Sequence, residues 1–281
     1  MTDSRSQPPN PPPSSSPLAT PEPWDLVAAA YASEAVPYFQ IFAREALVHA
    51  ALEPGARVVD VAAGPGTLSL LAAAAGARVS AIDFSERMVA ELESRRAAAG
   101  LAGAVEARVG DGQQLPFESG AYDAAFSMFG LMFFPDRAAG FREMRRVLKP
   151  GGRAIVSSWV PFDGAFGAIM KTAAEFLPGL PLGGGAKQPL ASPAEIQAEM
   201  SAAGFSAVTV VTVPQELTMP SFDAFWAAMQ RTNAPLVLVQ HRVGAERWAA
   251  VGPQIRERLR ATLGDGPLVA GRGAYLGIGV A

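Results

Sequence analysis

Short β-branched runs alternate with longer helical segments from Arg57 onward, and this alternation is the strongest structural signal in the chain. Strands are expected at residues 57–61, 78–82, 105–109, 122–128, 153–159, 205–213 and 274–280. Glycine and proline stops, such as Lys149-Pro150-Gly151-Gly152, separate them from apolar helices. Strands that alternate with helices predict an α/β fold with a mostly parallel sheet, right-handed crossovers and helices on both faces.

The remaining segments predict the domain organisation. Residues 1–23 are rich in proline and serine and nearly devoid of apolar side chains, so we expect a disordered tail. Residues 24–281 are expected to form one domain that begins with helices over 24–53. The insertions 161–191 and 214–272 exceed ordinary connections of about 2 to 6 residues, so they are expected to form a helical cap over the site. Within the second insertion, a helix over 221–231 and a helical stretch broken at Gly252-Pro253 are predicted.

The amino-acid composition excludes several classes of site and partner. The chain has no cysteine, which excludes disulfides, thiolate nucleophiles, zinc ribbons and iron–sulfur clusters. A net charge of −3 gives no electrostatic footprint for nucleic acid or an anionic membrane. The longest apolar run, residues 68–77, is shorter than the roughly 20 residues that a membrane span needs. We therefore expect a small-molecule partner, a cytoplasmic location without a secretory signal, and a monomer or homodimer.

Three aspartates mark the candidate site. In VVDVAAGPGTLSL, Asp60 ends a strand, and Gly64 and Gly66 follow in a turn that lets a ligand approach the backbone and a helix N-terminus. Asp83 ends the second strand, where a carboxylate can accept hydrogen bonds from both hydroxyls of a ribose. Asp111 follows the third strand and can accept from the amine of adenine. Each aspartate alone is typical of a helix cap or turn, but the three together favour an adenosyl ligand.

NAD(P) is the rival ligand of such a crevice, so an NAD(P)-dependent oxidoreductase is one alternative. Its fingerprint needs a third Gly or Ala where this chain has Ser69, and no tyrosine has a lysine four residues later. Phosphate-binding loops and nucleophile elbows are absent from the sequence, and His49 and His241 are the only histidines, so no metal site is expected.

From about Glu53 to Trp159, the sequence resembles the class I S-adenosylmethionine-dependent methyltransferases. Within them it is similar to the small-molecule group that includes the ubiquinone/menaquinone methyltransferases. The matching motifs are VVDVAAGPGT, AIDFSERMV, GDGQQLPF, YDAAFSMFGLMFFPD and LKPGGR, in that order. The resemblance implies a Rossmann-like sheet of seven strands with an antiparallel last strand, and S-adenosylmethionine as the cofactor.

The resemblance also implies a set of cofactor contacts. Asp60 and the backbone of Ala62, Gly64 and Gly66 would hold the methionine moiety, and Asp83 the ribose. The adenine would lie among Phe84, Ser85, Met88, Asp111, Gly112 and Gln113, while Ser127, Met128 and Phe129 would line the sulfonium side, and Tyr31 would fold over the cofactor. The family usually has glycine where Ala62 stands, so a slightly shifted loop that still binds is expected.

An apolar or aromatic acceptor is expected because aromatic side chains gather near the predicted strand ends and in the cap. The expected acceptor pocket comprises Phe133, Trp159, Phe162, Phe222, Phe225 and Trp226. The chemistry is in-line methyl transfer driven by positioning and removal of water, with O-methylation ahead of C- or N-methylation. His241, in the second insertion, is the candidate base for a hydroxyl acceptor. A non-catalytic protein that binds S-adenosylmethionine is the second alternative.

Overall fold

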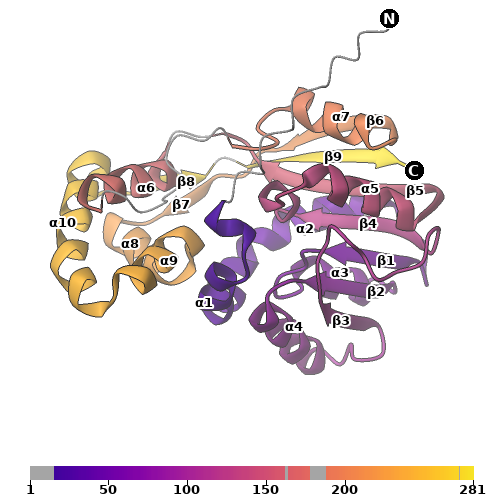
Figure 1. Cartoon of the computed structure of the whole chain (residues 1–281), viewed down its shortest axis with the longest axis horizontal. Helices are drawn as coiled ribbons and strands as arrows, with labels where there is room; N and C mark the ends of the chain where they lie inside the picture. The colour runs from indigo at the N-terminus through magenta and orange to yellow at the C-terminus, as the bar shows by residue number, and fades with distance from the viewer. Residues whose placement is uncertain (1–15, 162–163, 178–187, 272) are drawn as a thin grey trace, which may run out of the picture.

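The computed structural model describes residues 16–161, 164–177, 188–271 and 273–281. Seven strands form one sheet in the order β3-β2-β1-β4-β5-β9-β6 (Figure 1). Their bounds are β1 Arg57–Val61, β2 Arg78–Asp83, β3 Val105–Val109, β4 Tyr122–Met128, β5 Leu148–Trp159, β6 Ser206–Val213 and β9 Ala274–Val280. Only β9 runs antiparallel to its neighbours β5 and β6. The expected Rossmann-like sheet with an antiparallel last strand is therefore confirmed.

Two layers of helices cover the sheet. One face packs on α2 (Val36–Ala50), α3 (Thr67–Ala74) and α4 (Glu86–Ala98) through small and branched side chains such as Ala46, Leu68 and Leu92. The other packs on α5 (Arg137–Val147) and α7 (Pro193–Ala202), with Phe141 and Met200 fully buried. Because both faces are covered, central strands such as β1 are nearly continuous apolar runs.

The two insertions join into one cap, which lies beside the sheet in Figure 1. It contains α6 (Ala165–Phe176), α8 (Phe222–Thr232), α9 (Ala234–Val243) and α10 (Ala245–Leu263). A two-stranded sheet of β7 (Leu217–Met219) and β8 (Leu268–Gly271) completes it. Ile169, Leu236 and Ile255, from three of these helices, are fully buried in one common core.

The helix break predicted at Gly252-Pro253 is wrong, because α10 continues through Pro253. The break lies at Gly244, whose φ of 80° and ψ of 160° cannot continue a helix. None of the described helices is long and apolar enough to cross a membrane.

The N-terminal segment is ordered earlier than the sequence suggests. A 3₁₀ turn over Pro17–Ala19 precedes α1 (Glu22–Ala30), and the π-helical turn η2 (Tyr31–Ala35) joins α1 to α2. The prediction that the tail extends to residue 23 is therefore wrong for 16–23, where Leu18 packs against a small apolar cluster. Residues 1–15 of the predicted tail lie outside the described residues. Helix α1 contacts both α4 of the main domain and α9 of the cap.

Candidate functional site

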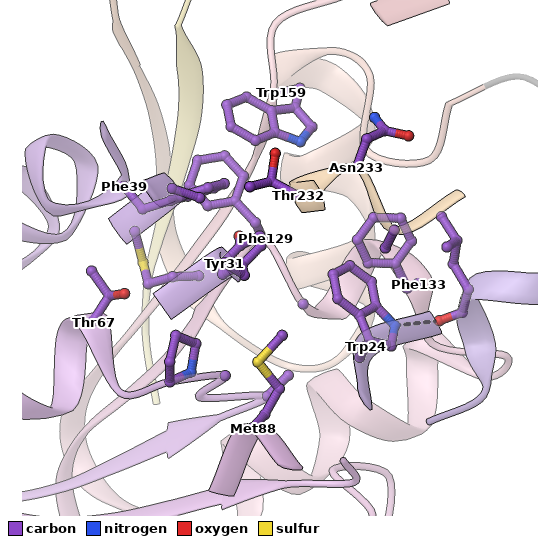
Figure 2. Close-up of a pocket in the computed structure, with 18 of the residues that line it drawn as sticks. Trp24, Tyr31, Phe39, Thr67, Met88, Phe129, Phe133, Trp159, Thr232 and Asn233 are labelled. Atoms are coloured by element: carbon purple, nitrogen blue, oxygen red, sulfur yellow. Dashed lines mark hydrogen bonds between the residues drawn. The ribbon is translucent and has the colours of Figure 1, made fainter. Parts of the chain in front are cut away.

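A cavity of about 920 Å³ lies where the carboxyl ends of the parallel strands meet the cap and the N-terminal helices. Figure 2 shows side chains from all three regions around this space. Most of the predicted cofactor contacts line it: Tyr31, Asp60, Ala62, Gly64, Asp83, Phe84, Met88, Asp111, Gly112, Gln113, Met128 and Phe129. The fold therefore brings the three strand-end aspartates to one cavity, as the sequence predicts.

Asp83 at the end of β2 organises the floor of the cavity. Its Oδ2 accepts a hydrogen bond from the Gly64 amide at 2.8 Å, and its Oδ1 accepts from the Ser85 amide at 2.9 Å. Burial raises the pKa of Asp83 to about 6, against the lowering effect of these backbone amides. Each carboxylate oxygen has a second lone pair, so Asp83 can still accept hydrogen bonds from two hydroxyl groups of a ligand.

Asp60 at the end of β1 is 1% exposed and is held by Ser69, whose Oγ donates to Oδ2 at 2.6 Å. Burial raises the pKa of Asp60 to about 7; the Ser69 hydrogen bond opposes this shift and the charge of Asp83 adds to it. Ser69 is the residue that breaks the dinucleotide fingerprint. In this structure it orients the first acidic side chain of the site.

The two glycines of the turn between β1 and α3 have different structural roles. Gly64, at φ +54°, has nothing within 4 Å of the position that a Cβ would occupy, so the turn leaves room on the cavity side. Gly66, at φ +77°, does not line the cavity; a Cβ there would lie 2.6 Å from Leu92 Cγ. The predicted cofactor contact at Gly66 is thus replaced by close packing of α3 against α4.

Ala62 adopts the left-handed conformation, with φ at 56°. A residue with a Cβ in the left-handed region destabilises the backbone by roughly 1–2 kcal/mol, so glycine suits this position. The methyl group of Ala62 is accommodated by Gly130, where a Cβ would lie only 2.3 Å from it. The turn therefore keeps its shape around Ala62 with the help of a glycine from the loop after β4.

Asp111 is exposed and belongs to a loop network. Its Oδ1 accepts from the Gln113 amide at 2.8 Å and from Gln113 Nε2 at 3.0 Å. Gln113 Oε1 in turn accepts from the Asp136 amide at 2.8 Å, at the N-terminus of α5. The loop expected to read adenine is thereby tied to the helix that follows β4.

Ser85 and Ser127, two further predicted cofactor contacts, lie behind the cavity wall instead of lining it. Ser85 is fully buried; its Oγ accepts from the Met88 amide at 3.0 Å and donates to Asp25 Oδ1 at 2.6 Å. Ser127 Oγ accepts from the Leu131 amide at 3.2 Å. Both side chains bond to neighbouring protein groups and neither lines the cavity, so these two contacts are corrected to structural roles.

Aromatic rings form one wall of the cavity. Phe129 and Trp159, from the ends of β4 and β5, stack at 4.1 Å, and Phe39 of α2 lies edge-on to both (Figure 2). Phe129 has φ at 61°, and its amide donates to Ser157 Oγ at 2.9 Å, which holds the ring in place. Residues at such strained positions cluster at functional sites.

Several predicted acceptor contacts are displaced from the cavity. Phe133 and Trp159 line it, but Phe222, Phe225 and Trp226 are buried in the cap core. The apolar face of α8 turns toward α6 and α10, so these rings hold the cap together. Phe162 lies outside the described residues.

His241 is exposed in the last turn of α9 and is not among the cavity residues. The side chain is therefore outside the lining of the space that an acceptor would occupy. The prediction of His241 as a base is therefore wrong on geometry.

Sequence reasoning missed a group of cavity residues from the N-terminal helices and the cap. They are Leu18, Trp24, Glu34, Tyr38, Phe39, Gln188, Thr232 and Asn233. Trp24 is oriented by a hydrogen bond from Nε1 to the carbonyl oxygen of Leu18 at 3.0 Å and packs on Phe133 at 5.2 Å. For the residues of the N-terminal helices, the local signal was the helical spacing of aromatic residues before β1, which is equally typical of a core stripe. For the cap residues, the sequence indicated only that the insertions cover the site.

The electrostatic character of the cavity is acidic. Its described lining carries the carboxylates of Glu34, Asp60, Asp83 and Asp111 and contains no Lys, Arg or His. Burial, followed by the charge of Asp83, raises the pKa of Tyr31. Such a lining complements a ligand that carries positive charge.

Comparisons with known proteins agree with this geometry. Residues 58–152 match the family described as "Methyltransferase domain". The chain is 39% identical over 129 residues to an uncharacterized protein of Mycobacterium tuberculosis, covering 46% of each chain. It is 40% identical over 124 residues to a demethylmenaquinone methyltransferase of Beutenbergia cavernae, covering 42% of this chain and 49% of that protein. The chain thus spans about half the length of the curated relatives it matches.

Solved structures share the fold at low identity. A [4+2]-cyclase superposes with a TM-score of 0.55 at 20% identity, covering 86% of this chain and 80% of the other. A phosphoethanolamine N-methyltransferase of Haemonchus contortus, bound to phosphomonomethylethanolamine and S-adenosylhomocysteine, gives 0.54 at 17% identity, covering 85% and 52%. At this level of identity, the likeness concerns the fold alone.

Proposed function

We propose that this chain, which has the fold and motifs of the class I S-adenosylmethionine-dependent methyltransferases, transfers a methyl group from S-adenosylmethionine to a small acceptor. The acceptor is largely apolar or aromatic, and O-methylation is favoured over C- or N-methylation. The observation that carries the proposal is the convergence of Asp60, Asp83 and Asp111 on one cavity at the sheet edge.

The residues present fit this cofactor. Asp83 retains free lone pairs for two ribose hydroxyls, and Gly64 leaves open space beside it. The carboxylate of Asp60 provides negative charge for the α-ammonium group of the methionine moiety. S-adenosylmethionine supplies an activated methyl group, so the protein mainly has to align the acceptor and exclude water. Such positioning can lower a barrier by about 7–11 kcal/mol.

The walls of the cavity support an apolar acceptor. Phe39, Phe129 and Trp159 form an aromatic side, and Met170 and Met229 of the cap form a soft apolar side. A volume of about 920 Å³ lies near the upper end of the usual range for ligand pockets, about 300–1,000 Å³, which leaves room for cofactor and acceptor together. Relatives named demethylmenaquinone methyltransferase make quinone-like compounds the first acceptors to test.

Proton removal has to proceed without His241. A hydroxyl acceptor needs its proton taken by a group within hydrogen-bond reach or by water. O-methylation by this site therefore favours acidic hydroxyls, such as those of phenols, over aliphatic alcohols.

Calorimetric titration with S-adenosylmethionine, S-adenosylhomocysteine and NADH tests the cofactor assignment. A methyltransferase should bind S-adenosylmethionine and S-adenosylhomocysteine but not NADH. An NAD(P)-dependent oxidoreductase should bind NADH but neither of the other two. Transfer of labelled methyl groups to a panel of phenols and hydroquinones then tests turnover. Cofactor binding without transfer to any acceptor would favour a non-catalytic binding protein.

A further inference from the structure

Two polar side chains of the cap line the cavity opposite the cofactor residues. Thr232 and Asn233 lie at the junction of α8 and α9, and Figure 2 shows them across the space from Met88. The surrounding wall is mainly apolar and aromatic, so a ligand in this half would meet few hydrogen-bonding groups. Those few groups fix orientation and specificity in such pockets.

The orientation of the Asn233 amide is set by its own helix. Asn233 caps α9, and its Oδ1 accepts a hydrogen bond from the Leu236 amide at 3.0 Å. The oxygen must face this N–H donor, so Nδ2 is the free end of the amide. No described residue accepts a hydrogen bond from Nδ2. Asn233 therefore offers hydrogen-bond donors to a ligand.

Thr232 and Gln188 offer the opposite polarity. Thr232 Oγ1 donates its proton to the carbonyl oxygen of Ala228 at 2.9 Å, which leaves the hydroxyl oxygen as an acceptor. Gln188 Nε2 donates to the carbonyl oxygen of Trp159 at 2.8 Å, which leaves Oε1 as an acceptor. Both residues line the cavity. A ligand in this cavity would thus meet both neutral donors and neutral acceptors.

Charge in this half disfavours an anion. The cationic neighbour of Thr232 is Arg231, which does not line the cavity and donates from Nε and Nη2 to the two Glu34 oxygens at 2.7 and 2.9 Å. Its charge is therefore paired. The same ion pair compensates the charge of Glu34. A carboxylate or phosphate on the acceptor would still find no cation among the described lining residues, and the strand-end aspartates of the same cavity add negative charge.

From this arrangement, we infer that Asn233 and Thr232 determine acceptor specificity. They select an uncharged acceptor that carries a carbonyl oxygen and a hydroxyl group on an apolar frame. The carbonyl accepts from Asn233 Nδ2, and the hydroxyl donates to Thr232 Oγ1. This inference rests on the proposed function, because it assigns the acceptor half of the same cavity.

A matched set of probes tests it: three naphthols that carry an aldehyde, a carboxylate or a methyl group on the ring opposite the hydroxyl. Their binding is measured calorimetrically to the full chain saturated with S-adenosylhomocysteine. We expect the aldehyde to bind about 10- to 100-fold more tightly than the methyl compound, because the methyl group would leave the desolvated amide donor of Asn233 without an acceptor. The carboxylate should bind most weakly.

Two variants test the role of Asn233. Asn233→Asp and Asn233→Ser both keep a good helix cap but remove the amide donor. Both should abolish the preference for the aldehyde while leaving the affinity for S-adenosylhomocysteine unchanged. For Thr232, the Thr232→Val variant should weaken all three naphthols, and Thr232→Ser should restore them. Thermal unfolding with and without S-adenosylhomocysteine checks that each variant is folded.

The inference is overturned if the methyl compound binds as well as the aldehyde, if the carboxylate binds best, or if the Asn233 variants keep the preference. Absence of binding by all three naphthols to the saturated protein also overturns it. Failure of S-adenosylhomocysteine itself to bind is a different outcome, which rejects the proposed function first.

Discussion

The amide of Gly64 donates a hydrogen bond to Oδ2 of Asp83 at 2.8 Å, so the turn after β1 and the acid at the end of β2 form one unit. The same carboxylate accepts from the Ser85 amide, just before α4. One side chain therefore fixes two loops of the cofactor site relative to each other. Removing its charge should affect both ligand contacts and loop position.

Asp83→Asn should weaken S-adenosylhomocysteine binding by about 1.5–3 kcal/mol, because hydrogen bonds to a charged acceptor are lost and an amide NH₂ would face backbone N–H donors. Isothermal titration calorimetry measures the change. Asp265→Asn, on an exposed cap residue, is the matched control and should leave the dissociation constant unchanged. Equal affinity of the folded Asp83 variant and the wild type would contradict the ribose assignment.

Cofactor affinity should fall as the pH drops through the range of the two buried acids. Burial raises the pKa of Asp60 to about 7 and that of Asp83 to about 6. The ligand binds the ionised carboxylates, so below these values protons compete with it. The dissociation constant of S-adenosylmethionine should rise by about tenfold per pH unit for each group that has become protonated. A flat profile between pH 8 and pH 5 would refute this coupling.

The pair Ala62 and Gly130 should behave as a coupled unit. Gly130→Ala places a Cβ 2.3 Å from that of Ala62, so it should lower the free energy of unfolding by about 1–3 kcal/mol. Ala62→Gly alone should be neutral or stabilising by up to about 1 kcal/mol, because it relieves the left-handed alanine.

The double variant of Ala62 and Gly130 should recover most of the loss, because the remaining neighbours of the new methyl group are 3.3 Å or more away. Urea denaturation of the four proteins gives the interaction energy. Simple additivity of the two changes would disprove the predicted clash.

Asp25 should hold helix α1 over the cavity. Its Oδ1 accepts from Ser85 Oγ at 2.6 Å and from the Arg87 amide at 3.2 Å. Asp25→Ala should lower the free energy of local opening of α1 by about 1–3 kcal/mol, which hydrogen exchange of peptides over residues 26–35 can measure.

The control for Asp25 is Glu22→Gln on the same helix. Glu22 forms an exposed ion pair with Arg242, for which an effect below about 1 kcal/mol is expected. If both variants open α1 equally, the Asp25 contact has no special role.

His241→Gln should leave methyl transfer within about twofold of the wild-type rate, because substitution of an exposed residue away from the cavity usually changes energies by less than about 0.5 kcal/mol. Steady-state kinetics on a phenol acceptor provide the test. A loss of about 10²- to 10⁴-fold would instead reinstate this residue as a base.

The cavity position of the residues proposed to hold the cofactor was predictable because it depends on local sequence. Asp60 and Asp83 lie at the ends of β1 and β2, and Gly64 and Asp111 lie in the loops after β1 and β3. Parallel strands bring these carboxyl ends to one edge. Ser85 and Ser127 were misplaced because their backbone lies at the site while their side chains satisfy nearby amides. Position along a strand therefore predicts the neighbourhood of a residue better than the direction of its side chain.

Phe133 and Trp159 were predicted for the acceptor half, and both line the cavity. Most other residues of this half were not predictable, because they come from distant helices whose rotation the sequence leaves open. Phe225 and Met229 lie one turn apart on α8, yet the first is sealed in the cap core and only the second reaches the cavity. Both fit the same amphipathic stripe. Distinguishing them requires knowing where α6 and α10 pack, and no short motif encodes that arrangement.

The position of β9 between β5 and β6 has a consequence for synthesis on the ribosome. Strands β1 to β5 can pair as they emerge, but β6 pairs only with β9 in this sheet. Strand β6 therefore cannot pair until residues 274–280 have left the exit tunnel. The second insertion of the cap is translated between these two strands. During that interval β6 has no partner strand in this sheet, and unpaired strand edges are prone to pair with other chains.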